Sequence, residues 1–142
     1  MMTPAYGQSE LVKKLCAEFQ TTDTCAVHVR GGDIVGPGRA FFERALVRME
    51  KERPGLRYLV FTNDKEAAKE ALEGEHTERK MTYISELGAF SDIDEFFLMA
   101  ACRHQIISNS SYSTWAAYLN PNPEKVVIMP EYKGCEQIRL KE

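Results

Sequence analysis

Five short apolar segments recur along this chain, and each is separated from the next by a segment with the periodicity of a helix. Strands that are apolar throughout are typical of a parallel sheet covered on both faces, and parallel strands need helical crossovers between them. The pattern therefore predicts a single Rossmann-like α/β domain over residues 1–142, with a mostly parallel five-stranded sheet and helices on both faces. The predicted strands are Cys25–Val29, Tyr58–Thr62, Met81–Ile84, Gln105–Ser108 and Lys125–Met129.

The intervening segments place apolar residues three and four positions apart, which is the pattern of amphipathic helices. Ser91 with Asp94 three residues on resembles a capping box, and the helix behind it is apolar nearly all round and predicted to be buried. Trp115 and Tyr118 are predicted to pack in the core. The last dozen residues give no clear pattern. The predicted helices are Gln8–Phe19, Arg39–Glu52, Lys65–Glu73, Ile93–Cys102 and one that starts within Asn109–Ser111 and ends near Leu119.

Net charge and cysteine usage restrict the classes of partner. The formal charge of −3 speaks against nucleic acid or an anionic membrane as the main partner. The four cysteines show neither a CxxC pair nor metal-ligand spacing, so we interpret them as thiols in a reducing compartment. The N-terminus has no apolar signal core and no apolar run reaches the length of a membrane span. We therefore expect a soluble, cytoplasmic chain.

Polar clusters follow three of the predicted strands. Because parallel strands end at one edge of a sheet, where α/β proteins bind their ligands, we expect these clusters to meet there. They are His28 with Arg30 and Asp33, Asn63 with Asp64, and Asn109–Tyr112.

Two of these clusters suit an anion. Arg30 offers a planar fork of donors for phosphate oxygens, and the adjacent Gly31 and Gly32 allow backbone to come close to a ligand. The hydroxyls and free N–H groups of Asn109–Tyr112, at a predicted helix start, form a phosphate cradle. Together they suit a pyrophosphate. Taken separately, an ordinary loop and an ordinary helix cap remain open as alternatives.

Other ligand motifs match poorly. The glycines that follow the first strand do not form GxGxxG, although a nicotinamide-dependent oxidoreductase stays open as an alternative. Asp92-Ile-Asp94 has the DxD form by which some sugar transferases hold a metal ion. Its place in the first turn behind Ser91 favours helix capping, so we expect no metal.

Four motifs, in order, resemble those of the α-1,2-fucosyltransferase family. His28–Asp33 is similar to HxRxGD, Phe61–Asp64 to FSDD, Leu98–His104 to LMxxCxH, and Ile107–Leu119 to SNSSFSWWGAxL. The resemblance covers roughly residues 8–130. It implies the donor-binding, C-terminal half of a GT-B-type glycosyltransferase that uses GDP-fucose without a metal ion and inverts the anomeric centre.

The resemblance also implies roles for particular residues. Arg30 would bind the β-phosphate and stabilise departing GDP, with Asp33 as the second catalytic residue. Ser110 and Ser111 would hold the pyrophosphate, and Asp64 and His104 would contact ribose or guanine. The full set of expected donor-binding residues is His28, Arg30, Asp64, His104, Asn109, Ser110, Ser111 and Tyr112.

The chain departs from the family pattern in ways that keep alternatives open. Gly31 stands where family members usually carry a second arginine, and Thr114 replaces the first tryptophan of the WW pair. Such enzymes also have an N-terminal half, and the acceptor glycan binds between the halves. The alternatives are a non-catalytic nucleotide-sugar-binding module, or a transferase whose cleft is completed by a homodimer or a partner chain.

Overall fold

The computed structural model describes residues 10–29, 39–72, 80–107, 111–130 and 136–140, and all structural statements below concern these residues. The helices are α1 (Glu10–Thr21), α2 (Arg39–Glu52), α3 (Lys65–Leu72), α4 (Asp92–Ala101) and α5 (Ser111–Leu119), with a short 3₁₀ turn at Ile84–Glu86. The strands are β1 (Thr24–Val29), β2 (Arg57–Thr62), β3 (Lys80–Tyr83), β4 (His104–Ile106), β5 (Val126–Pro130) and β6 (Glu136–Leu140).

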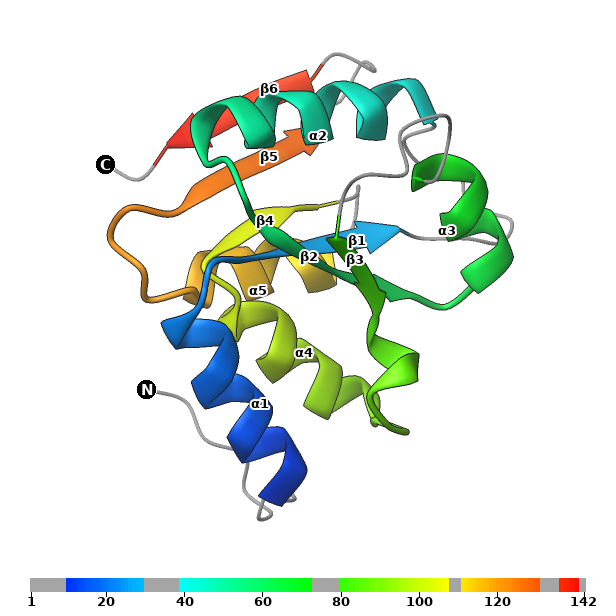
Figure 1. The fold of residues 1–142 in the computed structure, drawn as a ribbon, viewed down its shortest axis with the longest axis vertical. Coiled ribbons are helices and arrows are strands. Elements are labelled where there is room, and N and C mark those ends of the chain that lie inside the picture. The colour runs from blue at the N-terminus through cyan, green and yellow to red at the C-terminus, as the bar shows by residue number, and fades with distance from the viewer. Residues whose placement is uncertain (1–9, 30–38, 73–79, 108–110, 131–135, 141–142) are drawn as a thin grey trace.

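The strands form one sheet in the order β3-β2-β1-β4-β5-β6 (Figure 1). Neighbouring strands from β3 to β5 pair in parallel, as the alternating sequence pattern predicted. The strand β6 pairs antiparallel with β5, from Pro130 opposite Glu136 to Val126 opposite Leu140. This sixth strand lies among the last dozen residues, which show no clear pattern in the sequence.

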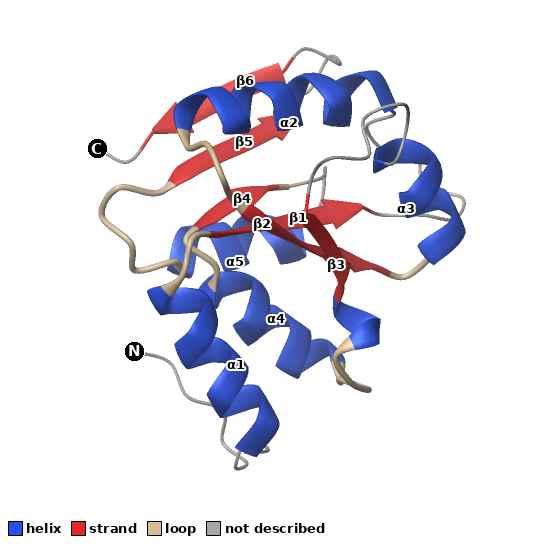
Figure 2. Ribbon diagram, in the orientation of Figure 1, coloured by secondary structure: helices blue, strands red, loops and turns tan. Residues whose placement is uncertain are grey.

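Helices cover both faces of the sheet (Figure 2). The helices α2 and α3 cover one face, where Phe42, Leu46 and Met49 are buried against Val27 and Val60. The helices α1, α4 and α5 cover the other face, over a second core. This two-faced arrangement confirms the predicted α/β fold class.

The second core alternates with the first along the same strands. Ala26 of β1 and Leu59 of β2 are buried there with Phe19 of α1 and Leu98 of α4. Successive side chains of a strand point to opposite faces, so an apolar run serves both cores at once. That is why the central residues of β1 and β2 are apolar on both faces.

The helix α4 begins with the predicted capping box. The Ser91 hydroxyl accepts the N–H of Asp94 at 3.1 Å, and the Asp94 carboxylate accepts the N–H of Ser91 at 3.3 Å. The expectation that the whole helix is buried was wrong for its first half, where residues 94–97 are only partly buried. Ile93 is 59% exposed, because it lies in the first turn, ahead of the buried residues Leu98–Ala101.

The prediction that Trp115 and Tyr118 pack in the core was also wrong. They are 58% and 72% exposed, whereas Ala116 and Ala117 between them are buried. The small residues allow α5 to lie close to the sheet, and the helical turn then directs the two large rings outward.

Three cysteines lie within the described residues, and all are free: Cys16, Cys25 and Cys102. Among the described helices, none combines the length and the apolar character needed to cross a bilayer.

Candidate functional site

The connections that follow β1 and β4 leave the sheet on opposite faces. After β1 the chain leads to α2 on one face of the sheet, and after β4 to α5 on the other. Neighbouring parallel strands whose connections leave on opposite faces open a crevice at their carboxyl ends, and this is where open α/β sheets bind ligands. The structure thus identifies one edge of the sheet, between β1 and β4, as the candidate site.

The three strands that the predicted clusters follow are neighbours in the sheet and end at this edge. The strands β2 and β4 flank β1 on either side, and adjacent strands lie about 4.8 Å apart, so the three strand ends fall within about 10 Å. Val29 at the end of β1 pairs with Thr62 at the end of β2. Arg30, Asp33, Asn109 and Ser110 follow these ends but lie outside the described residues, so their side chains are not placed.

His28 precedes the end of β1 by one residue. It pairs with Phe61 of β2 and is half-buried. Its neighbours Val27 and Val29 belong to the core under α2 and α3, so alternation directs His28 to the face covered by α1, α4 and α5. The imidazole therefore lies on the same face as the start of α5.

Asp64 follows β2 and caps α3. Its Oδ1 accepts the N–H of Ala67 at 3.2 Å, as the side chain of an N-cap residue does. Thr62 fixes the turn between them: its hydroxyl accepts the N–H of Asp64 at 3.0 Å and donates to the Asp64 carbonyl at 3.1 Å. This role of Thr62 was not predicted from the sequence, although a threonine two residues before an aspartate is typical of such a turn.

The helix α5 starts at this edge with Ser111 and ends at Leu119. Its N-terminal N–H groups and the positive end of its dipole lie on the side of the sheet edge where β4 ends, which favours an anion there. The far end is held by Lys125, whose Nζ donates to the carbonyls of Ala117 at 2.9 Å and Asn120 at 3.2 Å. The side chains of Ser111 and Tyr112 are not among those that the structure describes.

His104 does not lie with the other candidates. It is the first residue of β4 and pairs with Cys25 near the start of β1, so it sits at the amino edge, about 13 Å along the strands from Val29. It is 3% exposed, and its Nδ1 accepts the backbone N–H of Val126 at 2.9 Å. We therefore remove His104 from the candidate donor contacts. The sequence already indicates this position, because His104 directly precedes the predicted strand Gln105–Ser108 and so belongs at its amino end.

The Asp92-Ile-Asp94 motif lies in the first turn of α4. The Asp94 carboxylate completes the capping box, and both aspartates lie in the first turn of α4, where negative charge offsets the dipole. Within the described part of the chain, no three His, Cys, Asp or Glu side chains gather as they would to hold a metal ion.

A doubly wound parallel sheet with a helix that starts at its switch point is the architecture of nucleotide-binding α/β domains. Residues 9–141 match the model of "Glycosyl transferase family 11". The chain therefore belongs to glycosyl transferase family 11, in agreement with the fucosyltransferase-like motifs.

The chain is also similar to a curated protein in sequence and to solved structures in fold. The chain is 27% identical to the O-antigen biosynthesis glycosyltransferase WbnK of Escherichia coli over 150 aligned positions, which cover 92% of this chain and 48% of WbnK. Its fold is similar to that of NodZ α-1,6-fucosyltransferase in a crystal soaked with GDP-fucose, with TM-score 0.58, 15% identity, and coverage of 94% and 48%. NodZ from Bradyrhizobium gives TM-score 0.56 at 17% identity over 95% and 49% of the two chains. The chain thus spans about half the length of these relatives.

Proposed function

We propose that this chain is the donor-binding half of a fucosyltransferase. It binds GDP-fucose through the pyrophosphate at the carboxyl edge of the sheet and serves the transfer of fucose to a glycan hydroxyl. One observation carries the proposal: β2, β1 and β4 are adjacent, and the motif-bearing segments leave all three at the same edge. The match to glycosyl transferase family 11 supports a nucleotide-sugar donor as the substrate of that edge.

The chemistry follows from the leaving group. The bond between fucose C1 and the β-phosphate oxygen breaks, and the acceptor oxygen bonds to C1 from the opposite side, which inverts the anomeric centre. The acceptor proton passes to a carboxylate, for which Asp33 is our candidate. Negative charge grows on GDP, and in our proposal Arg30 and the start of α5 stabilise it without a metal ion. The finer α-1,2 linkage is the part of this proposal that follows from the motifs alone.

Calorimetry with GDP-fucose, GDP and GMP tests the donor site. We expect GDP to bind more tightly than GMP, because the β-phosphate is the group that is held. Ser111→Ala should weaken GDP binding more than GMP binding, whereas Ser85→Ala, at an exposed serine of the 3₁₀ turn, should change neither. An equal loss for both nucleotides would show that Ser111 only caps its helix. Binding of NAD in place of GDP would favour the oxidoreductase alternative.

A second candidate function is a nucleotide-sugar-binding module without activity of its own, or a subunit that requires a partner. The specific observation in its favour is that the chain aligns with 48% of WbnK and 48% of NodZ. A donor-hydrolysis assay distinguishes the two functions. Release of fucose and GDP from GDP-fucose by the isolated chain supports an enzyme, and tight GDP-fucose binding without turnover supports a module or subunit.

A further inference from the structure

Two aromatic rings stand on the outer face of α5 and form a corner. The ring centroids of Trp115 and Tyr118 are 5.7 Å apart, and the ring planes meet at 85°. Both side chains are more than half exposed. Rings in this arrangement offer a ligand one ring face as a floor and the second ring as a wall.

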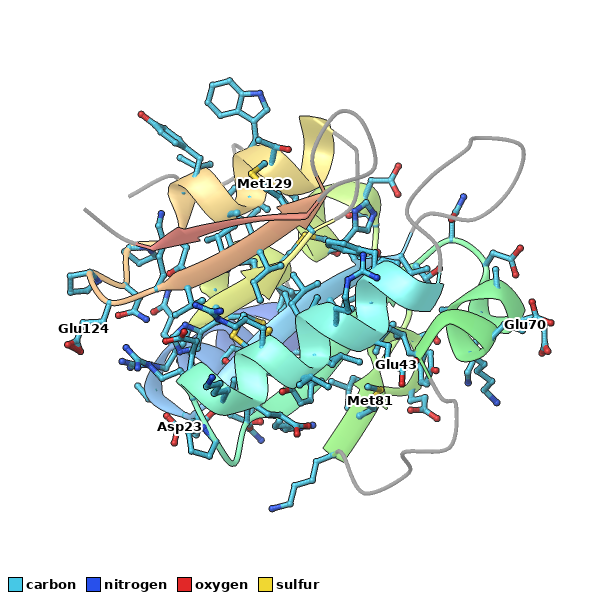
Figure 3. All side chains as sticks on the ribbon, turned by 90° about the horizontal axis from the view of Figure 1, so that it is seen from above. Asp23, Glu43, Glu70, Met81, Glu124 and Met129 are labelled. Carbon is cyan, nitrogen blue, oxygen red and sulfur yellow. The ribbon has the colours of Figure 1, made fainter. Side chains whose placement is uncertain are left out.

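The helix that carries this corner has no charge. None of its nine residues, SYSTWAAYL, is acidic or basic, whereas every other α-helix carries charged side chains. Figure 3 shows the contrast at Glu70, whose carboxylate extends outward from α3. A surface helix with exposed aromatic rings and no charge is suited to an uncharged partner that has apolar faces.

The backbone of α5 beneath the two rings is held by packing and by hydrogen bonds. Ala117, on the inner side of α5, is buried with Ile107 and Val127, and Met129 of β5 packs against this cluster. Figure 3 shows Met129 between the sheet and α5. Lys125 fixes the end of the helix through the Ala117 and Tyr118 carbonyls, at 2.9 and 3.3 Å. The backbone beneath the rings is therefore held in place before any ligand arrives.

The size of the patch argues for a small ligand over a second copy of the chain. A tryptophan and a tyrosine each bury about 150–250 Å² at most, while a stable dimer buries about 800 Å² per partner. The other exposed large apolar side chains among the described residues, Leu11, Val47 and Ile93, belong to other helices, α1, α2 and α4. Two rings match the area of one or two sugar residues.

We propose that Trp115 and Tyr118 form a stacking site for a pyranose ring of the acceptor saccharide. One face of a pyranose carries C–H groups, and the electron-rich face of an aromatic ring attracts them. Trp115 is four residues from the start of α5, about 6 Å along the helix from the donor edge, and Tyr118 about 10 Å. That spacing lets a saccharide stacked on the rings present a hydroxyl near fucose C1. This inference rests on the proposed transfer function.

Trp115 is the single tryptophan of the chain, so its fluorescence reports on the corner directly. The experiment titrates the full chain with a set of neutral disaccharides (lactose, N-acetyllactosamine, chitobiose and mannobiose), with sorbitol as the polyol control, and records emission and acrylamide quenching. We expect at least one disaccharide to shift the emission to shorter wavelength at millimolar concentration and to reduce quenching at least twofold. Sorbitol should do neither.

Matched variants separate stacking from general effects. Tyr118→Ala removes the wall but keeps the reporter, and it should weaken the saccharide response at least tenfold. Val47→Ser changes a comparably exposed apolar side chain on α2, at 54%, and should leave the response unaltered. Calorimetry with GDP on the same variants should give the affinity of the unmodified chain, because neither residue lies at the donor edge.

The outcomes are distinct. Failure of all four disaccharides to alter the emission overturns the stacking site, whatever the result with GDP. Emission that shifts with protein concentration, together with dimers in analytical ultracentrifugation that Tyr118→Ala abolishes, overturns it in favour of a second copy. A saccharide response without GDP binding would support this site and contradict the proposed donor function.

Discussion

Val126 donates its backbone N–H to Nδ1 of His104 over 2.9 Å, and this bond joins the first residues of β4 and β5 at the amino edge of the sheet. An imidazole that accepts at Nδ1 must be neutral there, because the imidazolium has only donors. His104 is therefore a structural acceptor, and its protonation would break the bond.

The first prediction concerns stability against pH. Burial, and then the nearby cations Arg53 and Arg103, lower the pKa of His104 from its ordinary value to about 4, against a smaller opposing effect of Asp23. Below about pH 6.5 the unfolded chain takes up a proton at this residue that the folded chain does not. The free energy of unfolding should fall as pH drops from about 6.5 to about 4.

His104→Asn isolates this contribution, since an asparagine oxygen can accept from Val126 without titrating. Urea unfolding of both proteins across pH 4–7.5 gives the slope of stability against pH. The variant should be less stable at neutral pH, yet its slope should be shallower by up to one proton. Parallel slopes would show that His104 does not couple folding to pH.

A second prediction concerns thiol reactivity. Burial raises the pKa of the Cys16 thiol to about 11, with a smaller effect from Asp94, and burial also raises the pKa of Cys25 and Cys102. The thiolate is the reactive form, so all three should resist alkylation. At pH 8, mass spectrometry of peptides should find them labelled by iodoacetamide at least tenfold more slowly in the folded chain than in urea. Rapid labelling of Cys25 in the folded chain would contradict its burial.

The third prediction separates helix capping from metal binding. If Asp94 only caps α4, then Asp94→Ala should cost about 1 kcal/mol of stability and leave GDP affinity unaltered. Replacing magnesium with EDTA should likewise not change GDP affinity in calorimetry. A tenfold loss on chelation would mean that Asp92-Ile-Asp94 holds a metal ion.

The sequence predicted the elements whose pattern is local. β1 and β2 are apolar on both faces, and the Ser91–Asp94 capping box marks a helix start within four residues. Each of these features can therefore be predicted from the local sequence alone. β6 was missed because a hairpin partner is defined by pairing with β5, which a local pattern does not show. Trp115 was misplaced because hydrophobicity does not tell which side of a helix a sheet will cover.

Only part of the candidate site was predictable from local sequence patterns. The positions after β1, β2 and β4 could be brought together because the parallel sheet was predictable. His104 was assigned by motif resemblance, which carries a residue's identity but not its edge of the sheet. His104 begins β4 and pairs with Cys25, so it lies about four residues from the carboxyl edge, where the donor is expected to bind.

The last prediction rests on Arg30, which directly follows Val29 at the end of β1. Charge-assisted hydrogen bonds to phosphate contribute on the order of 1.5–3 kcal/mol, and Gly31 offers no second arginine to replace them. Arg30→Ala should therefore weaken GDP binding roughly tenfold to a hundredfold, at about 1.4 kcal/mol per decade. Arg30→Lys should recover only part of the loss, because a point charge cannot bind two oxygens as a planar fork does.

Arg44→Ala, at an exposed arginine of α2, is the control and should leave calorimetric GDP affinity unchanged. If Arg30→Ala instead lowers the melting temperature of the ligand-free chain by several degrees and leaves GDP affinity intact, Arg30 serves the fold and the phosphate is bound elsewhere.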